Sequence, residues 1–432
     1  MRCAIVRNAA TWRSRCHRFQ ALRLARRAGE RSAQPALMTA AISLRPFARV
    51  WFCYFAAMGA FTLYAPLWYR DLGMSALAIG SIASLQSWTR VFAPYSWAYV
   101  ADHSNDRARM MRLAGVLCVA FALALAFSGR YGGAAVSICV ALLFIANGAV
   151  IPLMEASLAH HLNLAAGGGA GGRYGRARVW GSIGFMAAVL LFGALLNLLG
   201  IRAWPWLVLL LWGLLAVSLW HLPLANDPTH HDKAPVGTLA VLRRPEVAWF
   251  FVGIFFTVLA HTSLYAFFSL FAQSFGMSES AIGLLWSVGV LVEIGFFWTQ
   301  GHWFERLSMH SWLLLAAGVS ALRFGLMAAF GNWMVVLVLT QMTHAITFAA
   351  QHAACITLVS RYFPGRLRGR GQALYTTLGY GASGVIGGVA GGALIERWGY
   401  PAVFWASSVA ALLSVLCLLR SRRHAAIAGS SS

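Results

Sequence analysis

The chain has 432 residues, of which 59% are hydrophobic and 11% are charged, and its formal net charge is +22. Soluble domains carry roughly a quarter of charged residues, so this composition excludes an ordinary soluble domain and predicts an integral membrane protein. The basic residues lie between apolar runs of about 20 residues rather than on a polar domain, so we expect no nucleic-acid partner. The seven cysteines include no CxxC pair, which argues against a disulfide framework and a zinc site.

Residues 1–45 are predicted to form a basic N-terminal tail. The first 37 residues hold nine arginines and one acid, Glu30, and lack the apolar stretch of a secretory signal. Met38 stands shortly before the first apolar run. Two interpretations follow: translation starts at Met38, or a disordered cytoplasmic tail precedes the first helix.

The rest of the chain contains twelve apolar runs. They lie near 47–69, 76–100, 110–129, 134–160, 179–199, 203–221, 248–271, 279–301, 311–330, 333–359, 371–394 and 402–420. The sequence therefore predicts an all-α integral membrane fold of twelve transmembrane helices in two six-helix pseudo-repeats. We expect bundles at 46–222 and 247–421, a cytoplasmic linker at 223–246, which is rich in helix breakers and charges, and a cytoplasmic tail at 422–432.

Loop charge predicts the orientation, because Lys and Arg accumulate on the cytoplasmic side. With the N-terminus inside, the outer loops carry Arg70, Arg130, Arg202 and Arg397. The basic clusters at 107–112, 173–178, 233–244, 361–370 and 420–423 all fall on the inner side. We therefore expect a multi-pass protein of a bacterial-type inner (plasma) membrane with both termini in the cytoplasm.

A repeat links the two halves. The similar segments GMSALAIGS and GMSESAIGL begin at Gly73 and Gly276, 203 residues apart. Such internal repeats are typical of secondary transporters. At the same offset, the loop around Asp102 matches the loop around Glu305. In the eleventh run Gly384, Gly388 and Gly392 recur every four residues, which predicts a face for close helix packing.

Few ionisable residues lie inside the apolar runs, where each costs at least a few kcal/mol unless it pairs or faces water. Arg90 and Glu293 are 203 residues apart and so occupy equivalent positions with opposite charge. They form either a structural ion pair or a substrate or proton site on two walls of one cavity. His344 and His352, eight residues apart, should lie roughly on one helix face.

Several segments resemble a branch of the major facilitator superfamily, namely the phenylpropionate permease family and the related lactose-permease-like and nucleoside proton symporters. They are PLMEA at 152–156, YGRARVWGSIGF at 174–185, GLLWSVGVLVEI at 283–294, SALRFGLM at 320–327 and QMTHAITF at 341–348. The acidic and basic loops at 98–103 and 301–306 are similar to the inner-loop signature of the superfamily.

The resemblance implies roles by position. Glu155 and Arg178 match a substrate-binding acid and arginine, and Phe185 stands where the sugar symporters have a stacking tryptophan. Glu293, Arg323 and His344 match the substrate-binding and proton-coupling acid, arginine and histidine of the lactose-permease-like members. Together with the residues found above, the predicted substrate-binding residues also include Arg90 and Glu293, and the predicted proton-coupling residues are Glu293, Arg323, His344 and His352. One position departs from the sugar symporters, because Thr347 replaces their proton-carrying glutamate, and phenylpropionate-permease-like sequences are closer there.

We therefore expect a monomeric, proton-coupled symporter of a small organic substrate that works by alternating access. Its substrate would be an aromatic carboxylate such as 3-phenylpropionate, paired with Arg178 or Arg90 and packed on Phe185 or Trp286. No cofactor or metal is expected, because the proton gradient would drive transport. The expected partners are the substrate, protons and the lipid bilayer, and no enzymatic activity is expected. The alternatives are a sugar, oligosaccharide or nucleoside symporter, a membrane transferase, which would need a catalytic motif this chain lacks, and a sensor, which would need an output domain.

Mass spectrometry of the native protein tests the start of translation. If translation begins at Met38, the most N-terminal peptide starts at or just after that residue. A peptide that contains any of residues 1–37 would contradict this start and favour the basic tail.

Overall fold

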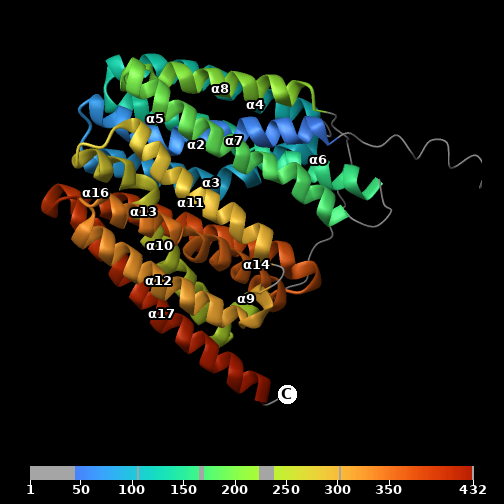
Figure 1. Ribbon diagram of the computed structural model, residues 1–432. Helices are drawn as coiled ribbons and strands as arrows, with labels where there is room; N and C mark the ends of the chain where they lie inside the picture. Colours follow the sequence, from blue (N-terminus) through green and yellow to red (C-terminus); the bar gives the residue numbers. More distant parts are fainter. Residues whose placement is uncertain (1–43, 105–106, 165–169, 223–237, 301–302, 431–432) are drawn as a thin grey trace, which may run out of the picture.

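The computed structural model describes residues 44–104, 107–164, 170–222, 238–300 and 303–430, and they form helices and short turns. Most of the predicted tail and residues 223–237 of the predicted linker lie outside the described residues. In Figure 1 the helices before residue 223, blue to green, lie above those after residue 237, olive to red.

The N-terminal half contains six membrane-length segments. They are α2 (Arg45–Asp71), α3 (Ala76–Ser104), α4 (Arg107–Ser128), the interrupted pair α5 (Gly133–Asn147) and α6 (Val150–Leu164), α7 (Ala170–Leu199) and α8 (Trp204–Trp220).

The C-terminal half repeats this plan after the short helix α9 (Thr238–Leu242). Its regular helices are α10 (Pro245–Ser274), α11 (Glu279–Thr299), α12 (Met309–Phe330) and α17 (Tyr400–Ser430). Two further segments contain π-helical turns: α13 (Met334–Met342), the turn Ala345–Ala350 and α14 (Gln351–Tyr362), and then α15 (Arg368–Leu374), the turn Tyr375–Ala382 and α16 (Ser383–Trp398).

Eleven segments of the described chain are long and apolar enough to cross a membrane. α3 is not among them, because Gln86, Ser87 and Arg90 lower the mean hydropathy of its sequence. Its 29 residues nevertheless span about 43 Å at 1.5 Å per residue. Counting α3, the described chain has the twelve predicted segments. α17 continues ten residues beyond the predicted run, through Arg420, Arg422 and Arg423 to Ser430.

The structure explains why the GMS segment occurs twice in the sequence. Gly73 and Gly276 have φ of 79° and 78°, a left-handed conformation that glycine adopts without strain, and each ends a helix. Two residues later Ser75 and Ser278 cap the next helix, accepting hydrogen bonds from the backbone N–H of Ala78 (3.2 Å) and Ala281 (3.3 Å). The two GMS segments therefore form the same tight helix-to-helix turn.

The two halves meet along two seams, α3 against α16 and α7 against α11. The predicted packing face is confirmed, because a Cβ atom on Gly388 would collide with the carbonyl oxygen of Gly80, and one on Gly392 would collide with that of Ala76. Close approach of this kind is favourable inside a membrane, where small residues let helix backbones touch.

Hydrogen bonds reinforce both seams at the same end of the bundle. The N–H of Leu77 donates to Oε1 of Glu396 at 3.0 Å, and Oγ of Ser280 donates to the carbonyl oxygen of Gly193 at 3.0 Å. Residues 77 and 280 are 203 apart, and so are 193 and 396. The two bonds therefore join equivalent pairs of positions across the two seams, although one is made by a backbone N–H and a carboxylate and the other by a hydroxyl and a backbone carbonyl, and together they close this end of the molecule.

Gly388→Val should disrupt this closure, because the new side chain would occupy the space of Gly80 and Ser84. With the native cysteines replaced and a reporter cysteine at Ile79, we expect roughly tenfold faster labelling by an impermeant maleimide from the face where α3 begins. Gly318→Val is the matched control, since a Cβ there meets no atom. Equal labelling rates for the two variants would contradict the closure.

Candidate functional site

A cavity of about 930 Å³ lies between the two halves. α2, α3, α5, α6 and α7 line it from the N-terminal half, and α10, α11 and the two segments with π-helical turns line it from the C-terminal half. It extends to Tyr95 on α3 and Gln372 on α15, away from the closed seams. Its aromatic lining includes Tyr54, Phe55, Phe61, Tyr69, Phe144, Tyr265, Trp286, Phe348 and Tyr380.

The structure brings five of the predicted site residues to this cavity: Arg90, Arg178, Phe185, Glu293 and His344. They come from four different segments, so only the folded bundle assembles them. The other three lie elsewhere.

Glu155 is not among the cavity-lining residues: it lies on α6 with an exposed side chain. Arg323 and His352 stand behind the lining, one beside His344 and the other beside Tyr375.

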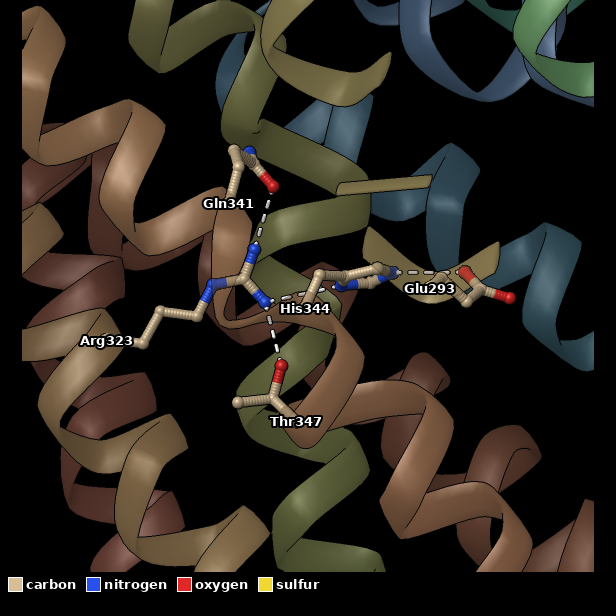
Figure 2. Close-up of polar contacts among 5 residues, drawn as sticks. All are labelled: Glu293, Arg323, Gln341, His344 and Thr347. Carbon is tan, nitrogen blue, oxygen red and sulfur yellow. Dashed lines mark hydrogen bonds and ion pairs between the residues drawn. The ribbon is translucent and has the colours of Figure 1, made fainter. Parts of the chain in front are cut away.

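Arg323 is the centre of a buried polar cluster, which Figure 2 shows. Its side chain is 1% exposed. Its guanidinium donates to Oε1 of Gln341 at 2.9 Å, to Oγ1 of Thr347 at 3.0 Å and to Nδ1 of His344 at 3.4 Å. A buried charge needs such partners, because the membrane interior offers no water to replace them. Thr347, the position that departs from the sugar symporters, is thus a neutral ligand of this arginine.

His344 connects Arg323 to the acid Glu293. Because a guanidinium only donates, Nδ1 of His344 must accept, and a neutral His344 therefore carries its hydrogen on Nε2. Nε2 lies 3.7 Å from Oε2 of Glu293 (Figure 2). Arg323, His344 and Glu293 thus form one line from the interior of the C-terminal half to the cavity. The structure therefore gathers three of the four residues predicted for proton coupling.

His352 belongs to a second polar chain. Its Nδ1 lies 3.1 Å from the hydroxyl of Tyr375, which lies 3.2 Å from the hydroxyl of Tyr380. The ring of Phe348 stacks on both histidines, with centroids 5.1 Å from His344 and 6.2 Å from His352. The two histidines thus share one side of their segment, as predicted, but an apolar ring separates their hydrogen-bonding chains.

Arg90 and Glu293 line the cavity from different halves. Glu293 lies beside His344, whereas Arg90 has an exposed side chain and no hydrogen-bond or ion-pair partner among the described residues. The structural ion pair considered for these residues is therefore not formed in this conformation. The pseudo-symmetric positions instead place opposite charges on two walls of one cavity.

Arg178, on α7, packs against aromatic rings of α2. Its guanidinium carbon lies 4.7 Å from the ring centre of Trp51 and 4.3 Å from that of Phe55. These cation–π contacts fix the side chain at the cavity wall. Arg178 and Arg90 make the N-terminal half of the cavity the more positive one.

Sequence reasoning missed His261 on α10, which lines the cavity and is buried. The signal that marks His344, a titratable residue inside an apolar run, also marks His261. The cavity tyrosines Tyr54, Tyr265 and Tyr380 carry no such signal, because tyrosine is common in apolar helices.

Comparison with known proteins agrees with this architecture. The chain matches the MFS_1 like family over residues 44–406. It belongs to this family of the major facilitator superfamily. As a member of the family, it is a multi-pass membrane transporter.

Two relatives named for their substrates cover most of the chain. A maltose permease of Geobacillus stearothermophilus is 29% identical over 89% of this chain and 95% of its own length. A probable 3-phenylpropionic acid transporter of Escherichia coli (strain K12) is 28% identical over 86% of this chain and 96% of its own length. The crystal structure of the nucleoside transporter NupG has a TM-score of 0.76 at 16% identity, covering 88% of this chain and 98% of NupG, and so shares the fold.

Arg323→Ala should destabilise this family member, because Gln341, Thr347 and His344 would each lose a buried donor. Leaving a buried acceptor unsatisfied costs about 1–3 kcal/mol, so we expect a clear fall in the melting temperature of the purified protein. Arg202→Ala is the control, since Arg202 forms an exposed ion pair with Asp71 at 3.2 Å and such pairs contribute little. An unchanged melting temperature for Arg323→Ala would show that the cluster is not stabilising.

Proposed function

We propose that this transporter is a proton-coupled symporter of a small organic anion, an aromatic carboxylate such as 3-phenylpropionate. The observation that carries the proposal is Arg90, a cation that lines an aromatic cavity and has no ion-pair partner among the described residues. A carboxylate bound there would supply the counter-charge.

The rest of the cavity suits such a substrate. Arg90 and Arg178 outnumber the acid Glu293, which already lies beside His344. Aromatic rings from both halves, among them Phe185 and Trp286, offer surfaces on which a substrate ring can pack. The name of the E. coli relative agrees with this substrate class.

The line from Arg323 through His344 to Glu293 is the proposed proton site. Glu293 faces the cavity, so a proton can reach it from water, and His344 lies next to it. Protonating Glu293 would remove a negative charge that repels an anionic substrate. Binding of the proton would therefore strengthen binding of the substrate in the cavity, and the reverse.

Transport would proceed by alternating access. The structure has its seams closed at one end and its cavity extending toward the other. Together with the loop charges, this supports an orientation in a bacterial-type inner membrane with both termini and the cavity facing the cytoplasm. The cavity lies within a single chain, so the proposed transporter would work as a monomer.

A second candidate is a proton symporter of a sugar, oligosaccharide or nucleoside. The maltose permease relative and the fold shared with NupG favour it. In that case Glu293 and the cavity tyrosines would bind substrate hydroxyls. Thermal-shift measurements with 3-phenylpropionate, maltose and uridine on the purified protein distinguish the two candidates by which compound stabilises it.

Arg90→Gln should weaken binding of 3-phenylpropionate at least about tenfold, because a charge-assisted bond to the carboxylate is lost. Arg90→Lys keeps the charge and should retain part of the affinity. Arg306→Gln, a loop arginine outside the cavity, is the control. Equal affinities of the Arg90→Gln and native proteins would rule out Arg90 as the carboxylate site.

Uptake of labelled 3-phenylpropionate should acidify the interior of proteoliposomes and stop when an uncoupler is added. Glu293→Gln removes the proposed proton carrier, so it should abolish accumulation driven by a proton gradient. Uptake that neither moves protons nor responds to the uncoupler would remove the symport claim while leaving substrate binding intact.

A further inference from the structure

Three hydrogen-bonding side chains form a chain from the interior of the C-terminal half to the cavity, apart from the line that ends at Glu293. Nδ1 of His352, on α14, lies 3.1 Å from the hydroxyl oxygen of Tyr375, which lies 3.2 Å from that of Tyr380. Tyr375 is 3% exposed, whereas Tyr380 is partly exposed and lines the cavity. The chain therefore connects a buried imidazole to a hydroxyl at the cavity wall.

The buried end of this chain sets the direction of its hydrogen bonds, because each tyrosine hydroxyl has one hydrogen to donate. When Nδ1 of His352 carries no hydrogen, it accepts from Tyr375, and the bond between the two tyrosines then uses the hydrogen of Tyr380. When Nδ1 carries a hydrogen, it donates to Tyr375, and Tyr375 donates to Tyr380. The hydrogen of Tyr380 is then free to point into the cavity.

The neighbours of the chain compete poorly for these hydrogens. The ring of Phe348 stacks on His352 with centroids 6.2 Å apart and offers it no hydrogen-bond partner. The thiol sulfur of Cys355 accepts from Nε2 of Gln351 at 3.3 Å, and sulfur is a weaker acceptor than an imidazole nitrogen for the hydrogen of Tyr375. The chain is therefore left with the two arrangements described above.

Tyr380 lies on a segment that packs directly on the helix of Arg90. A Cβ atom on Gly381 would collide with the side chain of Val91, so the residue after Tyr380 touches the residue after Arg90. Tyr380 and Arg90 both line the cavity. Because a carboxylate has two oxygens, one can pair with the arginine while the other accepts from a neighbouring hydroxyl.

We propose that Tyr380 binds the carboxylate of the transported anion and that His352 controls this bond through Tyr375. A carboxylate only accepts, so Tyr380 can bind it only when its own hydrogen is free, which requires a hydrogen on Nδ1 of His352. Tyr380 is thus a binding residue, and His352 is a positioning residue that does not touch the substrate.

The inference rests on the proposed function, in which Arg90 pairs with the carboxylate, and it deepens that function by adding a second link between proton and substrate. A hydrogen on Nδ1 of His352 strengthens binding of the carboxylate, and the bound carboxylate by reciprocity favours that hydrogen. Besides the two tyrosines, Arg178 on α7 is the charged residue, among those that the structure describes, whose charge acts on His352.

The experiment measures binding of radiolabelled 3-phenylpropionate to the full-length protein in nanodiscs from about pH 5 to about pH 8, which covers the ordinary titration of a histidine. Glu293→Gln is the common background, because it removes the titration of the cavity acid. In this background the affinity should still fall at least about fivefold from the low to the high end of the range.

Three variants in that background assign the effect. Tyr380→Phe removes the hydroxyl that binds the carboxylate and should weaken binding at least about fivefold at the low end of the range. Tyr375→Phe and His352→Phe each leave the hydrogen of Tyr380 free at every pH. Both should therefore retain the low-pH affinity, while the pH dependence falls below about twofold. A merely structural role of Tyr375 or His352 would instead weaken binding at every pH.

Tyr362→Phe is the matched control. Tyr362 lies on the same helix as His352, its hydroxyl is likewise bonded to a histidine, His310, at 3.2 Å from Nε2, and it lies outside the cavity lining. It should change neither the affinity nor its pH dependence. A comparison of Tyr375→Phe with the native protein, whose pH dependence should be the steeper, does not require the Glu293→Gln variant to fold.

Two results would overturn the control of Tyr380 by His352. The first is an affinity of Tyr380→Phe equal to that of the background, and the second is a pH dependence that persists in full in Tyr375→Phe and His352→Phe. Both leave Arg90 and Glu293 in their proposed roles. Failure of the native protein to bind 3-phenylpropionate at any pH would overturn the proposed function and this inference with it.

Discussion

A buried guanidinium in a membrane bundle needs hydrogen-bond acceptors, and at Arg323 the C-terminal half supplies three of them to the two terminal nitrogens, while Nε has no partner among the described residues. Gln341, His344 and Thr347 all turn toward it from one segment. A π-helical turn begins directly after His344, and such turns re-aim side chains at functional sites. The consequence reaches the cavity, because a histidine that accepts from Arg323 on one nitrogen presents the other to Glu293.

The two halves make symmetric contacts at the seams, but equivalent positions in the cavity carry different residues. At the closed end, the hydrogen bonds of Glu396 and Ser280 join equivalent pairs of positions, and the same GMS turn occurs in both halves. Inside the cavity the equivalent positions differ: Arg90 corresponds to Glu293, and Met58 corresponds to His261. Closure requires matched surfaces, whereas recognition of an asymmetric molecule requires different groups on the two walls.

The sequence predicted much of the fold and part of the site. Apolar runs of membrane length and the 203-residue repeat are properties of local sequence, so the helices and the close packing at Gly388 could be predicted. Arg90 and Glu293 were found because charge inside an apolar run is rare. Glu155 met the same criterion yet lies outside the cavity lining, since the criterion says that a residue is unusual but not which way its helix turns it.

The sequence alone did not predict which ionisable side chains contact each other. The repeat made an ion pair between Arg90 and Glu293 conceivable, and the structure instead sets Glu293 beside His344, while Arg90 has no partner in the part of the chain that the structure describes. Likewise, the predicted group of four coupling residues divides into two chains separated by Phe348. By itself the sequence determined the helices, their duplication and the rarity of their charges, because these depend on residue type and spacing along the chain. Only the tertiary structure decided which charges meet, which polar atoms stay unpaired and which residues face the cavity, because these depend on helix rotation and on contacts between segments far apart in the chain.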